Sequence, residues 1–248
     1  MENEVLKLIK DHRSIRKFTK DQIDEKLLDE ILDGARHASS HHNIQAYNII
    51  KVKDVEKKKI ISEIAANQKW IVDAPVFIII SMDYYRINQA CKMYDKEIQV
   101  SELESVIIGA VDSALVGQNI MTIAESYGLG GVIIGGIRNN VTKLIQILEL
   151  PEYTFPVFGI CLGYPDPEQI PSIKPRFPKD AVIFDEKYNK EKVDIELEKY
   201  NEITQEYYTI RTNGNRTDSW SKQMSEYISK DRRPFIKEQL IQQGLKCK

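Results

Sequence analysis

The chain is poor in several features that mark common functional classes. Its 248 residues include three cysteines, Cys91, Cys161 and Cys247, which form no C-x-x-C pair and no zinc spacing. We therefore expect reduced thiols in a cytoplasmic protein. The first residues lack the basic and apolar regions of a secretory leader. No apolar run approaches the ~18 residues of a membrane span, so no membrane partner is expected.

The chain also lacks an excess of charge of one sign. It has 35 Lys and Arg against 37 Asp and Glu, for a net charge of −2. A protein whose surface is devoted to nucleic acid is strongly basic, so we expect no nucleic-acid partner. Charge is uneven only near the end, where residues 181–206 carry a net −4 and residues 210–235 a net +3.

Signatures of nucleophilic catalysis and of common cofactor folds are missing as well. No G-x-S-x-G, catalytic-cysteine context or P-loop occurs. The stretch HASSHHN has His37, His41 and His42, but no further ligand completes a zinc set, so no metal is predicted. The run GLGGVIIGG (128–136) follows a helix and opens a strand, and Ile133 stands where the dinucleotide motif requires its third glycine. That motif is therefore excluded.

The hydrophobic pattern predicts strands interleaved with helices. Helices are expected from Val5, over 27–35, 57–66 and 141–148, and in an extension at 189–248. The expected strands are Tyr47–Val52, Ala74–Met82, Gly128–Gly136, Phe155–Gly163 and Ala181–Phe184.

A long helix over 102–127 dominates the pattern. It should start at a capping box of Ser101 and Glu104 and end at Gly128. Because this helix is apolar nearly all round, it must be buried by its own domain or by a second subunit. The connections are too irregular for repeated βαβ units, so the fold class is α+β, a mixed sheet with a long central helix.

Two basic clusters are the strongest positive signal. The first, DHRSIRKF (11–18), contains Arg13, Arg16 and Lys17. It fits either a solvated helix end or a cradle for a phosphate monoester, since guanidinium groups match phosphate oxygens. The second, IKPRFP, holds Lys174 and Arg176 on a backbone that Pro175 stiffens. Two such clusters on one chain favour the phosphate cradle.

Six motifs in order give these clusters a wider context. HRSIRKF, GLGGVIIGGIRNN, FGICLGYP, IKPRFP, NRTDSW and DRRPF together resemble the flavin-dependent nitroreductase family. More narrowly, the chain is similar to bacterial NADPH-dependent oxygen-insensitive nitroreductases and flavin reductases. The resemblance implies a mostly antiparallel sheet around a long central helix. It also implies an intertwined homodimer with FMN at two interface sites, and a single FMN-binding domain over 1–248.

The resemblance also implies the roles of individual residues. Arg13 would bind the FMN phosphate, and Arg16 would approach the N1/O2 edge and stabilise the reduced flavin as the catalytic residue. Arg211 and Arg216 match positions that bind the 2′-phosphate of NADPH, and Arg233 matches a substrate-side arginine. The implied FMN contacts are His12, Arg13, Ser14, Ile15, Arg16, Ser40, Gln68, Ile133, Ile134, Gly135, Gly136, Lys174, Pro175 and Arg176.

Two further features of the sequence bear on the substrates. Arg138, just after the glycine-bracketed strand, is placed to approach the same region as Arg211 and Arg216. The pair His41-His42 is bulkier than the small polar residues usual after Ser40 in the family, which bears on substrate preference.

The expected activity is FMN-dependent transfer of a hydride from NADPH, or from NADH, through flavin N5. The acceptors would be small electrophiles, namely nitroaromatics, quinones or free flavin, in a ping-pong mechanism that needs no protein nucleophile. Two alternatives remain at this point. One is an FMN-binding storage or sensor protein with little turnover, and the other is a phosphate- or nucleic-acid-binding module.

Overall fold

The computed structural model describes residues 3–100 and 102–245. Contacts divide these residues into two compact units. The larger unit comprises residues 3–171 and 233–245, and the smaller unit comprises residues 172–232. The sequence predicted one helical extension over 189–248. The smaller unit instead covers 172–232, and the helix after residue 233 belongs to the larger unit.

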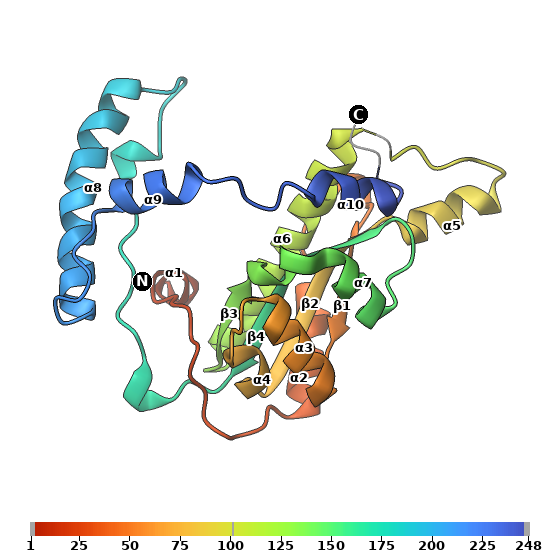
Figure 1. Cartoon of the computed structure of the whole chain (residues 1–248), viewed down its shortest axis with the longest axis horizontal. Helices are drawn as coiled ribbons and strands as arrows, with labels where there is room; N and C mark the ends of the chain where they lie inside the picture. Colours follow the sequence, from red (N-terminus) through yellow and green to blue (C-terminus); the bar gives the residue numbers. More distant parts are fainter. Residues whose placement is uncertain (1–2, 101, 246–248) are drawn as a thin grey trace. The chain divides into compact units, whose positions relative to one another are not determined.

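A four-stranded antiparallel sheet forms the centre of the larger unit (Figure 1). Its strand order is β1-β2-β4-β3. Alternate residues of β2 point to opposite faces, so Ile78 and Ile80 join one buried cluster while Phe77 and Ile79 join another. The strands are β1 (Tyr47–Lys51), β2 (Val76–Asp83), β3 (Gly130–Ile134) and β4 (Thr154–Gly163). Four of the predicted strands and the α+β class are thus confirmed.

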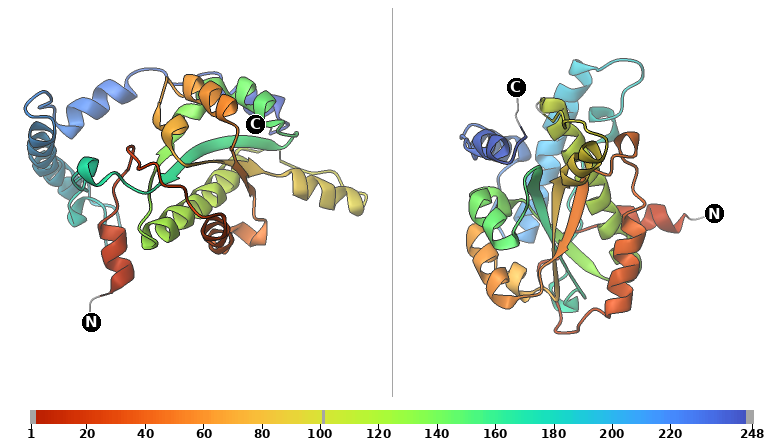
Figure 2. Two further views of the ribbon diagram at one scale, coloured as in Figure 1. Left: turned by 90° about the horizontal axis from the view of Figure 1, so that it is seen from below. Right: turned by 90° about the vertical axis from the view of Figure 1, so that its right-hand side faces the viewer.

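Helices α2 (Glu25–Ala35) and α6 (Leu103–Ser126) cover one face of the sheet (Figure 2, right). Asp24 caps α2 by accepting hydrogen bonds from the backbone N–H groups of Lys26 and Leu27. The predicted long central helix is confirmed as α6, and Gly128 follows it with a φ of 76°, a conformation in which glycine is favoured.

Two residues named in the sequence analysis fall outside the described part of the chain. Ser101, the expected first residue of the capping box, lies outside the described residues, and so does Cys247. Within the described chain, Glu102 occupies the position before the first helical residue.

Helices α3 (Val55–Ile64), α4 (Trp70–Asp73) and α7 (Val141–Leu148) cover the other face. Lys58 of α3 is buried among them, where its ammonium group donates to the carbonyl oxygen of Ala74 at 2.7 Å. Burial lowers the pKa of Lys58. The larger unit is completed by α1 (Glu4–Lys10), α5 (Tyr85–Met93), α10 (Ile236–Gln242) and the 3₁₀ turns His41–Asn43, Gly135–Asn140 and Pro167–Gln169.

The smaller unit consists of a 3₁₀ turn (Lys179–Ala181), α8 (Lys190–Arg211) and α9 (Trp220–Ile228). Rings of Phe177, Tyr200 and Trp220 hold it together, with centroids 4.1 Å apart for the first pair and 4.8 Å for Phe177 and Trp220. The predicted strand Ala181–Phe184 is wrong. Its described backbone has no partner strand, and Ile183 is 66% exposed, so neither ladder hydrogen bonds nor burial stabilises an extended segment.

Among the described helices, α6 alone is long and apolar enough to cross a membrane by length and composition. It lies instead against the sheet, where Val116, Ile120, Met121 and Ala124 are buried. A core helix passes the same test of composition.

Candidate functional site

The first basic cluster is anchored to the sheet through its backbone. Ile15 is buried, and its N–H donates to the carbonyl oxygen of Gly131 in β3 at 2.8 Å. Phe18 forms an isolated antiparallel bridge with Pro165. The chain therefore runs past β3 in a fixed register that buries Ile15 and leaves Arg16 exposed.

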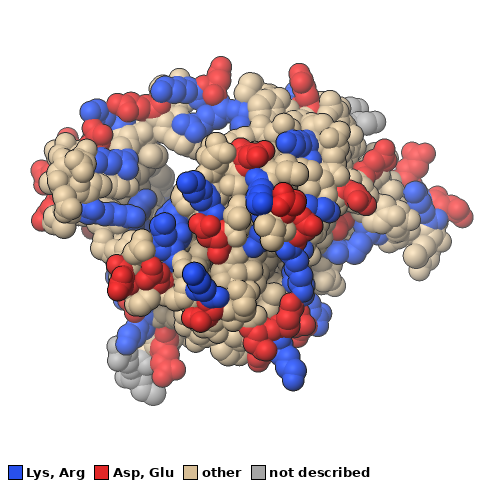
Figure 3. All heavy atoms as spheres, turned by 60° about the horizontal axis from the view of Figure 1, so that its bottom comes forward, with Lys and Arg blue, Asp and Glu red and all other residues tan. Residues whose placement is uncertain are grey.

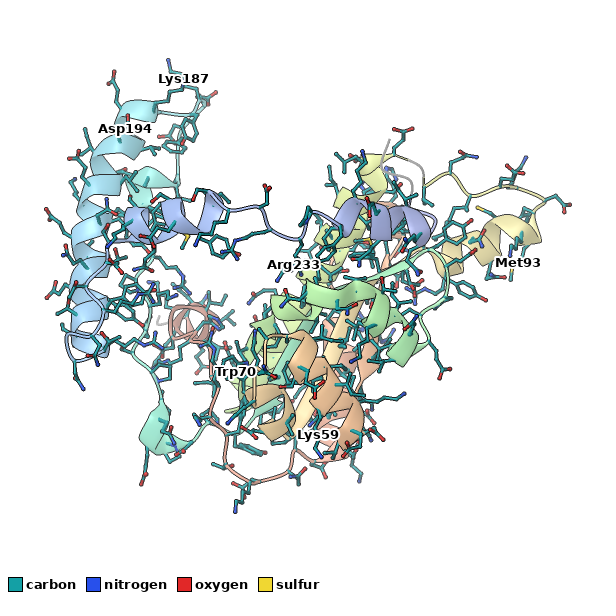
Figure 4. All side chains as sticks on the ribbon, in the orientation of Figure 1. Lys59, Trp70, Met93, Lys187, Asp194 and Arg233 are labelled. Carbon is teal, nitrogen blue, oxygen red and sulfur yellow. The ribbon has the colours of Figure 1, made fainter. Side chains whose placement is uncertain are left out.

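Arg16 lies beside Trp70, the first residue of α4. Its guanidinium carbon is 5.6 Å from the centre of the indole ring, within the range of cation–π attraction. Figure 4 labels Trp70 on the short helix next to the sheet. Trp70 was missed by the sequence reasoning, although it stands two residues after the predicted Gln68.

Gln68 and Gly136 lie together at the end of β3. A side chain at Gly136 would place its Cβ 2.9 Å from Gln68 Nε2 and 3.2 Å from Ala65. A larger residue here would displace the Gln68 amide and press on Ala65, so glycine favours this close approach. Of the preceding predicted residues, Ile134 is buried, whereas Ile133 is 48% exposed and offers an apolar surface on β3.

The 3₁₀ turn that follows β3 contains Arg138 and is bonded by Arg233. Arg138 donates to the carbonyl oxygen of Val157 and lies over Gly135, where an added Cβ would be 3.5 Å from its guanidinium. Arg233, labelled in Figure 4, donates through Nε to Asn139 Oδ1 at 2.9 Å. The structure thus brings residues from 68, 135–138 and 233 to one edge of the sheet.

His12 and Arg13 have different neighbours. His12 Nδ1 is 2.6 Å from Glu125 Oε1 of α6. Arg13 donates through Nε to the carbonyl oxygen of Asp11 at 2.9 Å and lines a cavity of about 270 Å³ beside Glu125. Ser14, between Arg13 and Ile15, is half-buried. Although Arg13 and Arg16 are close in sequence, Arg16 lies beside Trp70 and Arg13 lies beside the cavity near Glu125.

Ser40 stands in a loop between α2 and β1. Its hydroxyl accepts a hydrogen bond from the N–H of Gln45 at 3.3 Å. His41 and His42 follow, with rings in edge-to-face contact at 4.6 Å. Besides contacts within it, the loop has hydrogen bonds to β1, β2, α5 and α6, and Ala46 packs in a buried apolar cluster.

The second basic cluster lies in the smaller unit. Arg176 donates to the carbonyl oxygen of Lys174 at 2.8 Å, and the carbonyl oxygen of Pro175 accepts a hydrogen bond from Tyr200 at 2.9 Å. The lysine ammonium lies 5.9 Å from the ring centre of Tyr208. That these cations join Arg13 on one phosphate stays a prediction.

Arg211 and Arg216 gather on neighbouring tyrosines of α8. Arg211 donates to the hydroxyl of Tyr207 at 2.7 Å, and Arg216 lies 4.1 Å from the ring centre of Tyr208. The two rings are themselves in edge-to-face contact at 5.2 Å. These tyrosines were also missed, although Tyr207 and Arg211 have the four-residue spacing that places side chains together on a helix.

The chemical resources of this arrangement are cations, amides and bare backbone. Burial raises the pKa of the Cys161 thiol, which keeps it protonated and unreactive. In the chain as described, no group of three or more His, Cys, Asp or Glu side chains is arranged to hold a metal ion. Such a site suits the binding of a polar aromatic cofactor that itself carries the reaction.

Comparison with known proteins places these residues in a family. The model of the nitroreductase family matches residues 9–164, and that of the nitroreductase family C-terminal domain matches residues 174–248. The chain is 40% identical over 247 residues to an FMN reductase (NAD(P)H) of Bacillus subtilis, covering 98% of both chains. It is 37% identical over 241 residues to an oxygen-insensitive NADPH nitroreductase of Salmonella typhimurium, covering 96% of this chain and 97% of the relative.

The fold has a counterpart among solved structures. An NADPH:FMN oxidoreductase from Vibrio harveyi, solved with NAD+, matches with a TM-score of 0.90 and 34% identity over 99% of this chain and 100% of the other. Both sequence and structure therefore match over essentially the full length.

Proposed function

The chain belongs to the nitroreductase family and is an NAD(P)H-dependent oxidoreductase, and we propose that it uses FMN to reduce small electrophiles. The observation that carries this proposal is the group at the end of β3. There the Gln68 amide lies against Gly136, Arg16 lies beside Trp70 of the short helix α4, and Ile133 of β3 is exposed.

These side chains fit the chemistry of a flavin. An isoalloxazine ring has two apolar faces and a polar edge of alternating hydrogen-bond donors and acceptors. Ile133 offers an apolar surface, Gln68 offers an amide that both donates and accepts, and Arg16 offers a permanent positive charge. No Cβ at positions 135 and 136 blocks access to the backbone.

FMN, when bound, would supply hydride acceptance at N5 from the nicotinamide and later hydride donation to an oxidant, in a ping-pong cycle. The role proposed for Arg16 is electrostatic, since reduction leaves negative charge at the N1/O2 edge. Trp70 beside the guanidinium limits the freedom of that side chain. We assign the phosphate of FMN to Arg13, Lys174 and Arg176, and the remaining contacts to His12, Ser14, Ile15, Ser40, Ile134 and Pro175.

NADPH is the proposed donor, with NADH as a weaker alternative. Arg211 and Arg216 on the two tyrosines offer two cations to a 2′-phosphate. Arg138 and Arg233, held at the turn after β3, are proposed to contact the nicotinamide or the substrate. Nitroaromatics, quinones and free flavin are the proposed acceptors.

We further propose a homodimer with two sites at its interface, located in the cytoplasm. Exposed apolar residues recur on α6 at intervals of four, which leaves a helix face that a second subunit would cover. They are Leu103, Ile107, Val111 and Leu115, each at least 41% exposed. An interface site draws residues from both subunits, which accounts for the separate position of the Ser40 loop.

A single preparation tests this function. The purified protein should be yellow, and NADPH should bleach it under anaerobic conditions before a quinone or nitroaromatic restores the colour. Sedimentation should give about twice the 28.7 kDa of one chain. Yellow protein that NADPH does not bleach would favour a storage or sensor role, and colourless protein would contradict FMN binding.

The remaining alternative, a module for nucleic acid, finds less support. Figure 3 shows Lys and Arg interspersed with Asp and Glu over the face that it draws. Binding to a phosphate backbone favours a continuous positive stripe.

A further inference from the structure

The loop from Ser40 to Ala46 has an unusual backbone. His42, Asn43 and Gln45 have φ angles of 45°, 58° and 52°, in the left-handed region that residues other than glycine rarely occupy. Such conformations persist when the surrounding structure holds them in place, and they are frequent at functional sites. The loop must therefore be fixed by contacts from outside itself.

Asp112 of α6 holds the N–H groups of this loop. Its Oδ1 accepts a hydrogen bond from the backbone of His41 at 3.1 Å, and its Oδ2 accepts one from the backbone of Ala46 at 3.0 Å. The aspartate is 1% exposed. One carboxylate thus joins the two ends of the strained segment.

Arg86 of α5 holds the carbonyl groups. Its guanidinium donates to the oxygen of Gln45 at 2.7 Å and to that of Tyr47 at 2.5 Å. Asp83, at the end of β2, lies 3.8 Å from the same guanidinium. A carboxylate from α6 therefore binds N–H groups at both ends of the loop, and a guanidinium from α5 binds C=O groups at its junction with β1.

A carboxylate buried on a core helix is costly unless its charge is used. Neighbouring positions of α6 pack apolar or small side chains against the sheet and α2, and helix packing alone does not require a charge at position 112. The carboxylate makes its described hydrogen bonds to the loop. Its contribution is therefore to the conformation of residues 41–46.

We propose that Asp112 and Arg86 are positioning residues, which hold the Ser40–Ala46 loop so that Ser40 and the His41-His42 pair line the place where the flat electron acceptor binds. This inference rests on the proposed function. It assigns the choice of acceptor to a loop whose shape is set from α5 and α6, at residues that do not themselves contact the acceptor.

The test compares Arg86→Gln with the wild type and with Lys59→Gln. Arg86 has a 55% exposed side chain, so its variant should fold. Lys59 forms an exposed ion pair with Glu56 within α3, and its replacement makes the same change of charge away from the loop. Asp112→Asn, which keeps the size of the side chain, is the second test variant.

Three measurements separate positioning from a merely structural role, all made on FMN-saturated protein. For Arg86→Gln we expect the KM for a quinone and a nitroaromatic to rise at least fivefold. Anaerobic flavin reduction by NADPH should change less than twofold. Hydrogen exchange at the Ala46 amide should be at least tenfold faster in both test variants, while Lys59→Gln resembles the wild type in every respect.

Unchanged acceptor KM in Arg86→Gln, with the wild type turning over, would overturn the inference and leave the proposed function intact. Slow exchange at Ala46 in both variants would overturn the clamp itself. Failure of the wild type to reduce any acceptor would overturn the proposed function, and with it the role of the loop in acceptor choice.

Discussion

Different interactions stabilise the two units of this chain. The larger unit has three clusters of buried apolar side chains around its sheet. Within the fully described range 172–232, Tyr200 and Thr204 are the only buried residues. The smaller unit depends instead on the ring contacts of Phe177, Tyr200 and Trp220, and on side-chain caps such as Thr204 accepting from the N–H of Trp220 at 3.0 Å.

This difference matches a difference in the proposed tasks. Gln68 and Gly136 lie together at the end of β3 and Arg16 lies beside Trp70, so their neighbours Ala65 and Trp70 belong to a packed core. Lys174, Arg211 and Arg216 belong to the smaller unit and lie against half-buried tyrosines. A redox cofactor needs positions held within fractions of an ångström, whereas recognition of a donor phosphate tolerates mobile cations.

The comparison predicts that the smaller unit opens more easily than the larger one. Tyr200→Ala removes a buried ring and the hydrogen bond to Pro175, at a cost of about 3–5 kcal/mol. Because the smaller unit has so little other burial, we expect residues 172–232 to lose protection from hydrogen exchange. The strands β2 and β4 should stay protected.

The matched control is Ile79→Ala, which creates a cavity in the fully buried side of the sheet at a cost of ~2–5 kcal/mol. Its effect should appear in the thermal unfolding of the larger unit. If Tyr200→Ala lowered protection equally in β2, the two units would form one cooperative structure and the comparison would fail.

Alkaline pH should destabilise the larger unit through a buried tyrosine. Burial, with a further contribution from the charge of Asp112, raises the pKa of Tyr84 in the larger unit from 10.0 to about 12. A group whose pKa is raised by folding stabilises the protein fully below its unfolded pKa, and this stabilisation is lost as pH rises to the folded pKa. The loss for Tyr84 should reach ~2–3 kcal/mol between pH 10 and about 12.

Urea unfolding at several pH values checks this window. Tyr84→Phe should be less stable at pH 8, because the carbonyl oxygen of Ser105 loses its hydroxyl donor, but its stability should fall less steeply above pH 10. Lys58 acts in the opposite direction, and only below its ordinary pKa of 10.5. An unchanged slope in Tyr84→Phe would show that another group controls alkaline unfolding.

The sequence predicted the parts of the structure that depend on local pattern. The bounds of α7 agree with the prediction residue for residue, because an apolar face and the Asn140 cap define the helix locally. The strand predicted at 181–184 was wrong. Its apolar residues suggested a buried strand, but in the structure none of them is buried and no described strand lies beside them.

Contacts between side chains far apart in the sequence could not be predicted, because no local pattern in a single sequence indicates them. The contacts of Trp70 with Arg16 and of Asp112 with His41 join residues 54 and 71 positions apart, and neither pair belongs to a motif. The resemblance supplied Arg16, Gln68 and Gly136 by position. Their neighbours became visible only in three dimensions.

The smallest expected effect concerns the choice of donor by the smaller unit. NADPH differs from NADH by one phosphate, and Arg211 and Arg216 are the cations proposed to bind it. A charge-assisted hydrogen bond contributes ~1.5–3 kcal/mol, so Arg211→Ala or Arg216→Ala should raise the KM for NADPH about tenfold or more. The KM for NADH should stay within about twofold, since NADH lacks the group whose partner has been removed.

Arg232→Ala is the matched control, because Arg232 lies 3.1 Å from the ring centre of Tyr227 in the same unit and its loss changes the charge equally. Steady-state rates with both donors against one quinone measure the effect. Equal losses with NADPH and NADH would assign these arginines to the structure of the smaller unit and would break the division of tasks between the two units.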